Sequence, residues 1–110
     1  MFTKTVEKAL NKQIEAEMAS SQYYLAMASW AETKGFNGVS DFLYGQSDEE
    51  RGHMLKLVKY INERGGQALV PAMKAQPKSF KSLTFVFEQL LAHEIEVSRL
   101  INELIAICME

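Results

Sequence analysis

The sequence has only one cysteine and two prolines among its 110 residues. The lone thiol, Cys108, excludes a disulfide within the chain and a zinc site built from several cysteines. Both prolines, Pro71 and Pro77, share one segment, so the long stretches on either side contain no proline that would break a helix.

Long apolar runs and a surplus of positive charge are also missing. No apolar run approaches the roughly 18 residues that a membrane span needs, and the polar start MFTKTVEKALNKQ is not followed by the apolar core of a secretion signal. The formal net charge of −2 at pH 7 gives no basic surface for nucleic acid. We therefore expect a cytoplasmic protein that binds neither membranes nor nucleic acids.

What is present is helical periodicity. The apolar fraction of 47% is ordinary for a single globular domain over residues 1–110. The spacing of the apolar residues predicts an all-α fold with helices at about 5–34, 39–64 and 83–109. The predicted buried stripes are Val6, Leu10, Ile14, Ser21, Leu25 and Ala28, then Val39, Phe42, Leu43, Leu57 and Ile61, then Leu83, Val86, Leu90, Val97, Ile101, Leu104 and Cys108.

The two connections differ in length, and this difference indicates a topology. About four residues, 35–38, join the first two helices, which should then be antiparallel neighbours. About 17 residues, 65–81, join the second and third; fully extended they reach about 50 Å, whereas a helix of about 26 residues is about 39 Å long. The third helix can therefore run parallel to the second, as in four-helix bundles with one long crossover.

A fourth helix is not found in this sequence, which ends within the third. Three amphipathic helices would leave an apolar groove at the place of the fourth. We expect such a groove to be filled by a second copy of the chain or by another protein.

Acidic residues fall on the apolar stripes near the middle of each predicted helix. At about 100° per residue, Glu17 lies on the first stripe, Glu50 and His53 lie on either side of the centre of the second, and Glu94 lies on the third. Buried carboxylates need protons, partners or a metal, and no lysine or arginine shares these stripes at that level. Oxygen-rich ligand sets with an imidazole favour iron or manganese. Di-iron bundles combine single glutamates with Glu-x-x-His pairs, of which Glu50 and His53 form one.

Each position also has a plainer interpretation. A lone Glu-x-x-His is common, and a single glutamate on an apolar stripe often reaches water from its edge. Tyr24, two turns after Glu17, fits core packing or a redox or hydrogen-bonding role. Glu49 fits a solvated acid, and His93 a surface or interface histidine. A strip of Tyr23, Met27 and Trp30 on the outer side of the first helix indicates a subunit interface.

The stretches LNKQIEAEMASSQYYLAMASWAE, FLYGQSDEERGHMLKLVKYINERGG and FEQLLAHEIEVSRLINELI resemble bacterial non-haem ferritins over essentially the whole chain. The resemblance implies a ferritin-like four-helix bundle, truncated after its third helix, with a di-iron ferroxidase centre. Iron(II) would be oxidised there by dioxygen or peroxide and stored in a hollow shell of subunits. By position, Glu17, Glu50 and His53 match ligands of the first iron, with Glu50 bridging. Glu94 matches a ligand of the second iron.

The same resemblance assigns Glu49 to a third iron position and Tyr24 to the tyrosine beside the centre. Three features depart from the family. The fourth helix, which supplies a further Glu and a Gln, and a short fifth are absent from this sequence. Gly45 and Gly52 stand where relatives carry larger polar residues, at a cost of about 1 kcal/mol each relative to alanine. The haem-binding sister group has a methionine at the Gly52 position, so no haem is expected.

Three functional interpretations follow from these features. The first is an iron-storage and detoxification subunit with ferroxidase activity, which forms a homo-oligomer or assembles with other ferritin subunits. The second is a non-catalytic truncated ferritin that dimerises or co-assembles as an iron-binding module. A short-chain relative of the encapsulated ferritins, in which two chains complete one site, is a third interpretation.

Overall fold

The structure, a computed structural model, describes residues 3–109. It consists of three helices, α1 (Lys4–Thr33), α2 (Asn37–Glu63) and α3 (Leu83–Cys108), and these residues contain no strand. The predicted helix bounds are correct to within two residues. The molecule is elongated, with extents of 49 × 22 × 21 Å. Within the described residues, none of the helices has the length and apolar content to cross a membrane.

Local capping fixes where the helices begin and end. The hydroxyl of Thr3 accepts a hydrogen bond from the backbone N–H of Val6 at the start of α1, and Ser82 caps α3 in the same way. Gly35 and Gly65, with φ of 80° and 86°, follow the ends of α1 and α2. Glycine adopts this left-handed conformation without the strain that a side chain would introduce.

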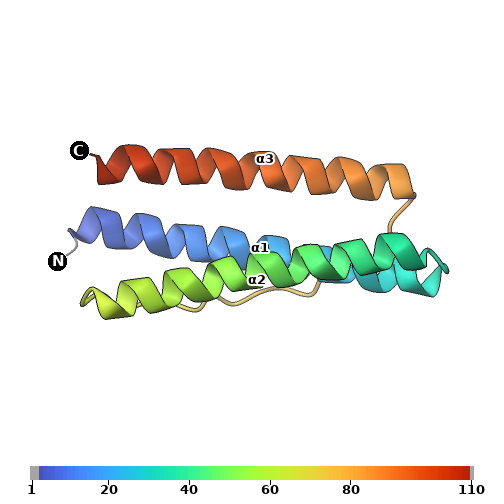
Figure 1. Cartoon of the computed structure of the whole chain (residues 1–110), viewed down its shortest axis with the longest axis horizontal. Coiled ribbons are helices and arrows are strands. Elements are labelled where there is room, and N and C mark those ends of the chain that lie inside the picture. The colour runs from blue at the N-terminus through green and yellow to red at the C-terminus, as the bar shows by residue number, and fades with distance from the viewer. Residues whose placement is uncertain (1–2, 110) are drawn as a thin grey trace.

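The topology is the predicted one (Figure 1). Helices α1 and α2 form an antiparallel pair, and the crossover runs back along the bundle to its other end. As a result α3 runs parallel to α2 and packs against α1. No Cα atom of α2 lies within 8 Å of a Cα atom of α3 in the described part of the chain.

Serines join α1 to α2 at close range. The hydroxyl of Ser21 donates to the carbonyl oxygen of Ser47 at 2.8 Å, and the Ser47 hydroxyl donates to the carbonyl oxygen of Ser21 at 2.8 Å. Nearer the turn, Ser40 donates to the carbonyl oxygen of Ala28 at 3.0 Å. These bonds satisfy polar groups that would otherwise be buried without partners. They set the register of the two helices that carry Glu17 and Glu50.

The core confirms most of the predicted stripes and corrects four positions. Leu25, Phe42 and Ile101 are 43%, 47% and 39% exposed, and Cys108 is exposed as well. On α1, the residues that face the two neighbouring helices include Tyr24 and not Leu25. Phe42 on α2 and Ile101 on α3 lie on helices whose Cα atoms stay more than 8 Å apart in the described residues, so both side chains keep much of their surface exposed. The Phe42 ring still lies 6.4 Å from the ring of Phe87 on α3.

The strip on the outer side of α1 is covered by the chain itself. Met27 is fully buried and Trp30 is 8% exposed. The ring of Phe80, at the end of the crossover, lies 5.8 Å from the ring of Trp30 and 5.6 Å from that of Tyr23. The predicted subunit interface here is therefore wrong, because the crossover folds back onto this side of α1.

Candidate metal centre

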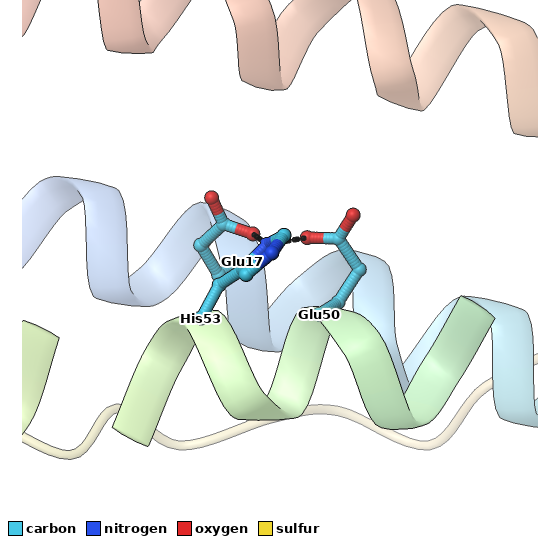
Figure 2. Close-up of side chains that lie close together, drawn as sticks. All are labelled: Glu17, Glu50 and His53. Carbon is cyan, nitrogen blue, oxygen red and sulfur yellow. Dashed lines mark ion pairs between the residues drawn. The ribbon is translucent and has the colours of Figure 1, made fainter. Parts of the chain in front are cut away.

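Three of the predicted ligands come together in the middle of the bundle (Figure 2). Glu17 extends from α1, and Glu50 and His53 extend from adjacent turns of α2. His53 Nδ1 lies 3.5 Å from Glu17 Oε2 and 3.6 Å from Glu50 Oε2. One ligand atom from each residue lies within 4.8 Å of the other two, a spacing at which a single metal ion could contact all three.

Burial makes this cluster unfavourable without a cation. Glu17 is 2% exposed and Glu50 is 4% exposed, and the Oε2 atom of each is buried without a hydrogen-bond partner. A buried carboxylate oxygen without a partner costs free energy that a bound cation would offset. The His53 side chain is 45% exposed, so the cluster is open to solvent on one side.

The electrostatics of the metal-free cluster favour a proton on Glu50. Burial, together with the neighbouring carboxylates Glu17 and Glu94, raises the pKa of Glu50 to about 9. In the described part of the chain, neither Glu17 nor Glu50 forms an ion pair with a lysine or arginine. A metal ion entering this site would therefore displace a proton from Glu50.

Glu94 and Tyr24 form a second pair beside these ligands. The Tyr24 hydroxyl donates to Glu94 Oε1 at 2.9 Å, and Tyr24 is fully buried. Burial and this hydrogen bond raise the pKa of Tyr24 well above its usual value. Glu94 is not one of the three clustered ligands, but its charge contributes to the raised pKa of Glu50.

Glu49 stands apart from the other predicted ligands. It is exposed, and it does not belong to the group whose ligand atoms lie close together. The structure therefore places it as a solvated acid on α2, one residue before Glu50.

Sequence reasoning missed Gln13. The residue is 3% exposed, and its side-chain amide donates from Nε2 to Glu17 Oε1 at 3.0 Å. One oxygen of Glu17 is thereby occupied, whereas Oε2 faces His53. The sequence does contain a signal for this contact, because Gln13 lies one helical turn before Glu17 on the same stripe.

His93 is more enclosed than predicted. It is half-buried, its Nδ1 lies 3.3 Å from the Ser20 hydroxyl, and its ring lies 4.7 Å from the Tyr23 ring. Burial lowers the pKa of His93, and the nearby Glu94 opposes that change. Of the predicted surface or interface positions, neither describes this contact within the chain, in which the ring of His93 packs against Tyr23 and Tyr24 and its Nδ1 lies beside the Ser20 hydroxyl on α1.

The family model for the ferritin-like domain matches residues 7–110. A probable bacterial non-heme ferritin-like protein of Haemophilus influenzae is 40% identical over 105 residues, which cover 96% of this chain and 64% of that protein. A bacterial non-heme ferritin of Bacteroides fragilis is 38% identical over 107 residues, or 97% of this chain and 67% of that protein. The chain thus spans about two thirds of the length of these relatives.

Solved structures agree with the sequence relatives. An open pore ferritin from the hyperthermophilic archaeon Archaeoglobus fulgidus superimposes with a TM-score of 0.93 at 34% identity. The match covers 99% of this chain and 67% of that one. A ferritin from Chlorobium tepidum gives a TM-score of 0.91 at 34% identity, with the same shares covered.

Proposed function

The chain belongs to the ferritin family, and from this premise we propose that it binds Fe(II) as a substrate and oxidises it to Fe(III) for storage and detoxification. The observation that carries the proposal is the pair of buried, partnerless oxygens, Glu17 Oε2 and Glu50 Oε2, beside His53 Nδ1. A cation that supplies the missing partner would bind between α1 and α2. We propose the cytoplasm as the location.

The geometry supports the following proposed ligand roles. The first Fe(II) binds Glu17, Glu50 and His53, which offer two oxygens and one imidazole nitrogen, a ligand set that suits iron. Glu50 interacts with both Glu17 and Glu94, and we propose that it bridges to a second Fe(II) held by Glu94. The hydroxyl of Tyr24 keeps Glu94 oriented. Glu49 remains a candidate for a third, more exposed iron position.

The redox step balances without a protein nucleophile. Each Fe(II) loses one electron, so two Fe(II) ions reduce one dioxygen to hydrogen peroxide with the uptake of two protons. Hydrogen peroxide in turn can oxidise two further Fe(II) ions as it is reduced to water. The residues contribute by holding two ions close together and by neutralising the charge of Fe(III) with carboxylates.

Oxygen consumption tests this function. With excess Fe(II), we expect the chain to consume dioxygen at least ten times faster than its Glu50→Ala and His53→Ala variants, because each variant removes a ligand from the buried cluster. Glu15→Gln, an exposed acid on α1, serves as the matched control and should keep the full rate. Circular dichroism verifies that all variants are folded. Equal rates for the chain and the two ligand variants would refute ferroxidase activity.

A second candidate function is a non-catalytic assembly module. Leu91 and Ile95 on α3 are 62% and 61% exposed, and large apolar residues exposed on one helix favour association. Association through this face would cover them, either with a second copy or with another ferritin subunit. Sedimentation of the chain and of its Leu91→Lys, Ile95→Lys variant tests this. A larger species that the double substitution dissociates, together with slow iron oxidation, would favour the module over the enzyme.

A further inference from the structure

A pocket of about 560 Å³ lies between α1, α3 and the crossover, apart from the three clustered ligands. Its walls include Ala19 and Tyr23 from α1, His93 from α3, and Met73, Lys74 and Gln76 from the crossover. This volume is typical of sites for small organic molecules, which are lined mainly by apolar and aromatic groups with a few polar ones. Neither the predicted ligands nor the proposed oxidation of iron uses this pocket.

Aromatic rings connect the pocket to the metal centre. The ring of Tyr23 lies 4.7 Å from that of His93, at an angle of 32°. The His93 ring lies 6.0 Å from that of Tyr24, and the Tyr24 hydroxyl donates to Glu94. All of these separations fall within the range of direct aromatic contact. Rings in contact therefore extend from a wall of the pocket to a proposed iron ligand.

We propose that this pocket binds a small planar hydroquinone and that the rings of Tyr23, His93 and Tyr24 carry its electrons to Fe(III) at the centre. A planar aromatic ligand can stack on Tyr23. His93 Nε2 has no hydrogen-bond partner in the described part of the chain and can bond to a quinone oxygen. Lys74, exposed at the pocket, attracts an anionic substituent on the ring.

The electron balance is simple. A hydroquinone that is oxidised to the quinone loses two electrons and two protons. The electrons reduce two Fe(III) ions to two Fe(II) ions, and the protons pass to solvent. The pocket would thus return Fe(III) held at the centre to the more soluble Fe(II), and this role rests on the proposed iron function. Binding of the ligand does not depend on iron, so the two proposals can fail separately.

Binding is tested on the iron-free protein with 1,4-naphthoquinone-2-sulfonate as the probe. The single tryptophan, Trp30, reports on the pocket because its ring lies 5.8 Å from Phe80, which in turn lies 5.6 Å from Tyr23. Quinones quench tryptophan fluorescence. We expect saturable quenching by one probe per chain, whereas free N-acetyltryptophanamide should give only linear collisional quenching.

Variants of the pocket wall decide whether this site is responsible. Tyr23→Leu removes the stacking ring and Ala19→Phe fills the pocket; each should raise the Kd of the probe at least tenfold. Tyr23→Phe keeps the ring and should stay within threefold of the parent, as should Leu25→Ala, an exposed control on α1. Circular dichroism identifies a variant that fails to fold. Absence of saturable quenching, or a Kd that neither Tyr23→Leu nor Ala19→Phe changes, would overturn the proposal.

Electron transfer is then tested without dioxygen on protein loaded with Fe(III). The reduced probe should release two Fe(II) per molecule consumed, measured as a coloured Fe(II) chelate. At saturating probe, Tyr23→Leu should slow the release at least tenfold, and Tyr23→Phe should not. A rate that Tyr23→Leu leaves unchanged would overturn the path through the rings.

Discussion

Glu50 couples metal binding to pH at the scale of a single residue. Its pKa of about 9 means that the metal-free site carries a proton at neutral pH, which a metal ion must displace. We therefore expect the affinity for Zn²⁺, a redox-silent probe, to rise by about tenfold per pH unit between pH 7 and 8.5. Competition with a coloured chelator measures this affinity.

Two variants control this prediction. In Glu50→Gln there is no carboxyl proton for Zn²⁺ to displace. The affinity for Zn²⁺ should therefore be weak and should change less with pH. Asp48→Asn, an exposed acid on the same helix, should behave like the parent. If the Zn²⁺ affinity of the parent protein stays constant between pH 7 and 8.5, Glu50 either binds no metal or is already ionised.

Gln13 is expected to act as a positioning residue for Glu17. Its amide bonds Glu17 Oε1 at 3.0 Å and leaves Oε2 to face the centre. In Gln13→Leu the carboxylate loses this partner and can rotate, so we expect a loss of about tenfold in Co²⁺ affinity and a changed Co²⁺ absorption spectrum. Gln13→Asn is too short to reach Glu17 in the same way and should not restore the spectrum. Gln22→Leu on the same helix is the control, and an unchanged spectrum in Gln13→Leu would contradict the role.

The sequence predicts single residues well where one helical stripe decides their position. Glu17, Glu50 and His53 were placed together because each lies on an apolar stripe near the middle of its helix, and the structure brings them within 4.8 Å. Contacts between segments were harder to foresee. The burial of Tyr23 and His93 depends on how the crossover and α3 meet α1, which no periodicity within one helix encodes.

At the scale of the helices, Gly45 costs α2 stability without a visible packing need. A Cβ atom built at Gly45 would meet nothing within 4 Å. We expect Gly45→Ala to raise the free energy of unfolding by about 1 kcal/mol, measured by urea denaturation. Gly35→Ala is the matched control and should destabilise instead, because its φ of 80° strains any side chain. A destabilising Gly45→Ala would indicate that a partner packs closely on this face.

Helix bounds were predictable to within two residues because caps and glycines are local signals. The apolar stripes were less reliable. Leu25 and Phe42 were predicted to be buried, yet both are more than 40% exposed. Which side of a helix is covered depends on the angular position of its neighbours. Helix α1 packs closely against both other helices, whereas the Cα atoms of α2 and α3 stay more than 8 Å apart in the described residues.

For the whole molecule, the raised pKa of Glu50 makes the metal-free fold sensitive to alkali. The native state keeps the proton up to a pKa of about 9, whereas in the unfolded chain Glu50 ionises near its ordinary value of 4.5. Between these values the native state binds more protons, so the free energy of unfolding should fall as pH rises from about 5 to 9. The fall can be measured as the urea midpoint of the metal-free protein at several pH values, compared with the midpoints of Glu50→Gln. Parallel pH profiles for the two proteins would contradict the assigned pKa shift.

Bound metal should reverse this trend. An ion on the ionised carboxylates stabilises only the folded molecule, so saturating Zn²⁺ should raise the urea midpoint most at pH 8 to 9. This result would link the site to the stability of the α1–α2 pair that carries it.

Glu17, Glu50 and His53 are proposed to bind iron together. Crystals of the protein soaked with Fe(II) without dioxygen, and measured at the iron absorption edge, test it most directly. We predict an anomalous peak at coordination distance from Glu17 Oε2, Glu50 Oε2 and His53 Nδ1, with a second peak between Glu50 and Glu94. Iron peaks only at exposed carboxylates, with none among these three atoms, would contradict the account.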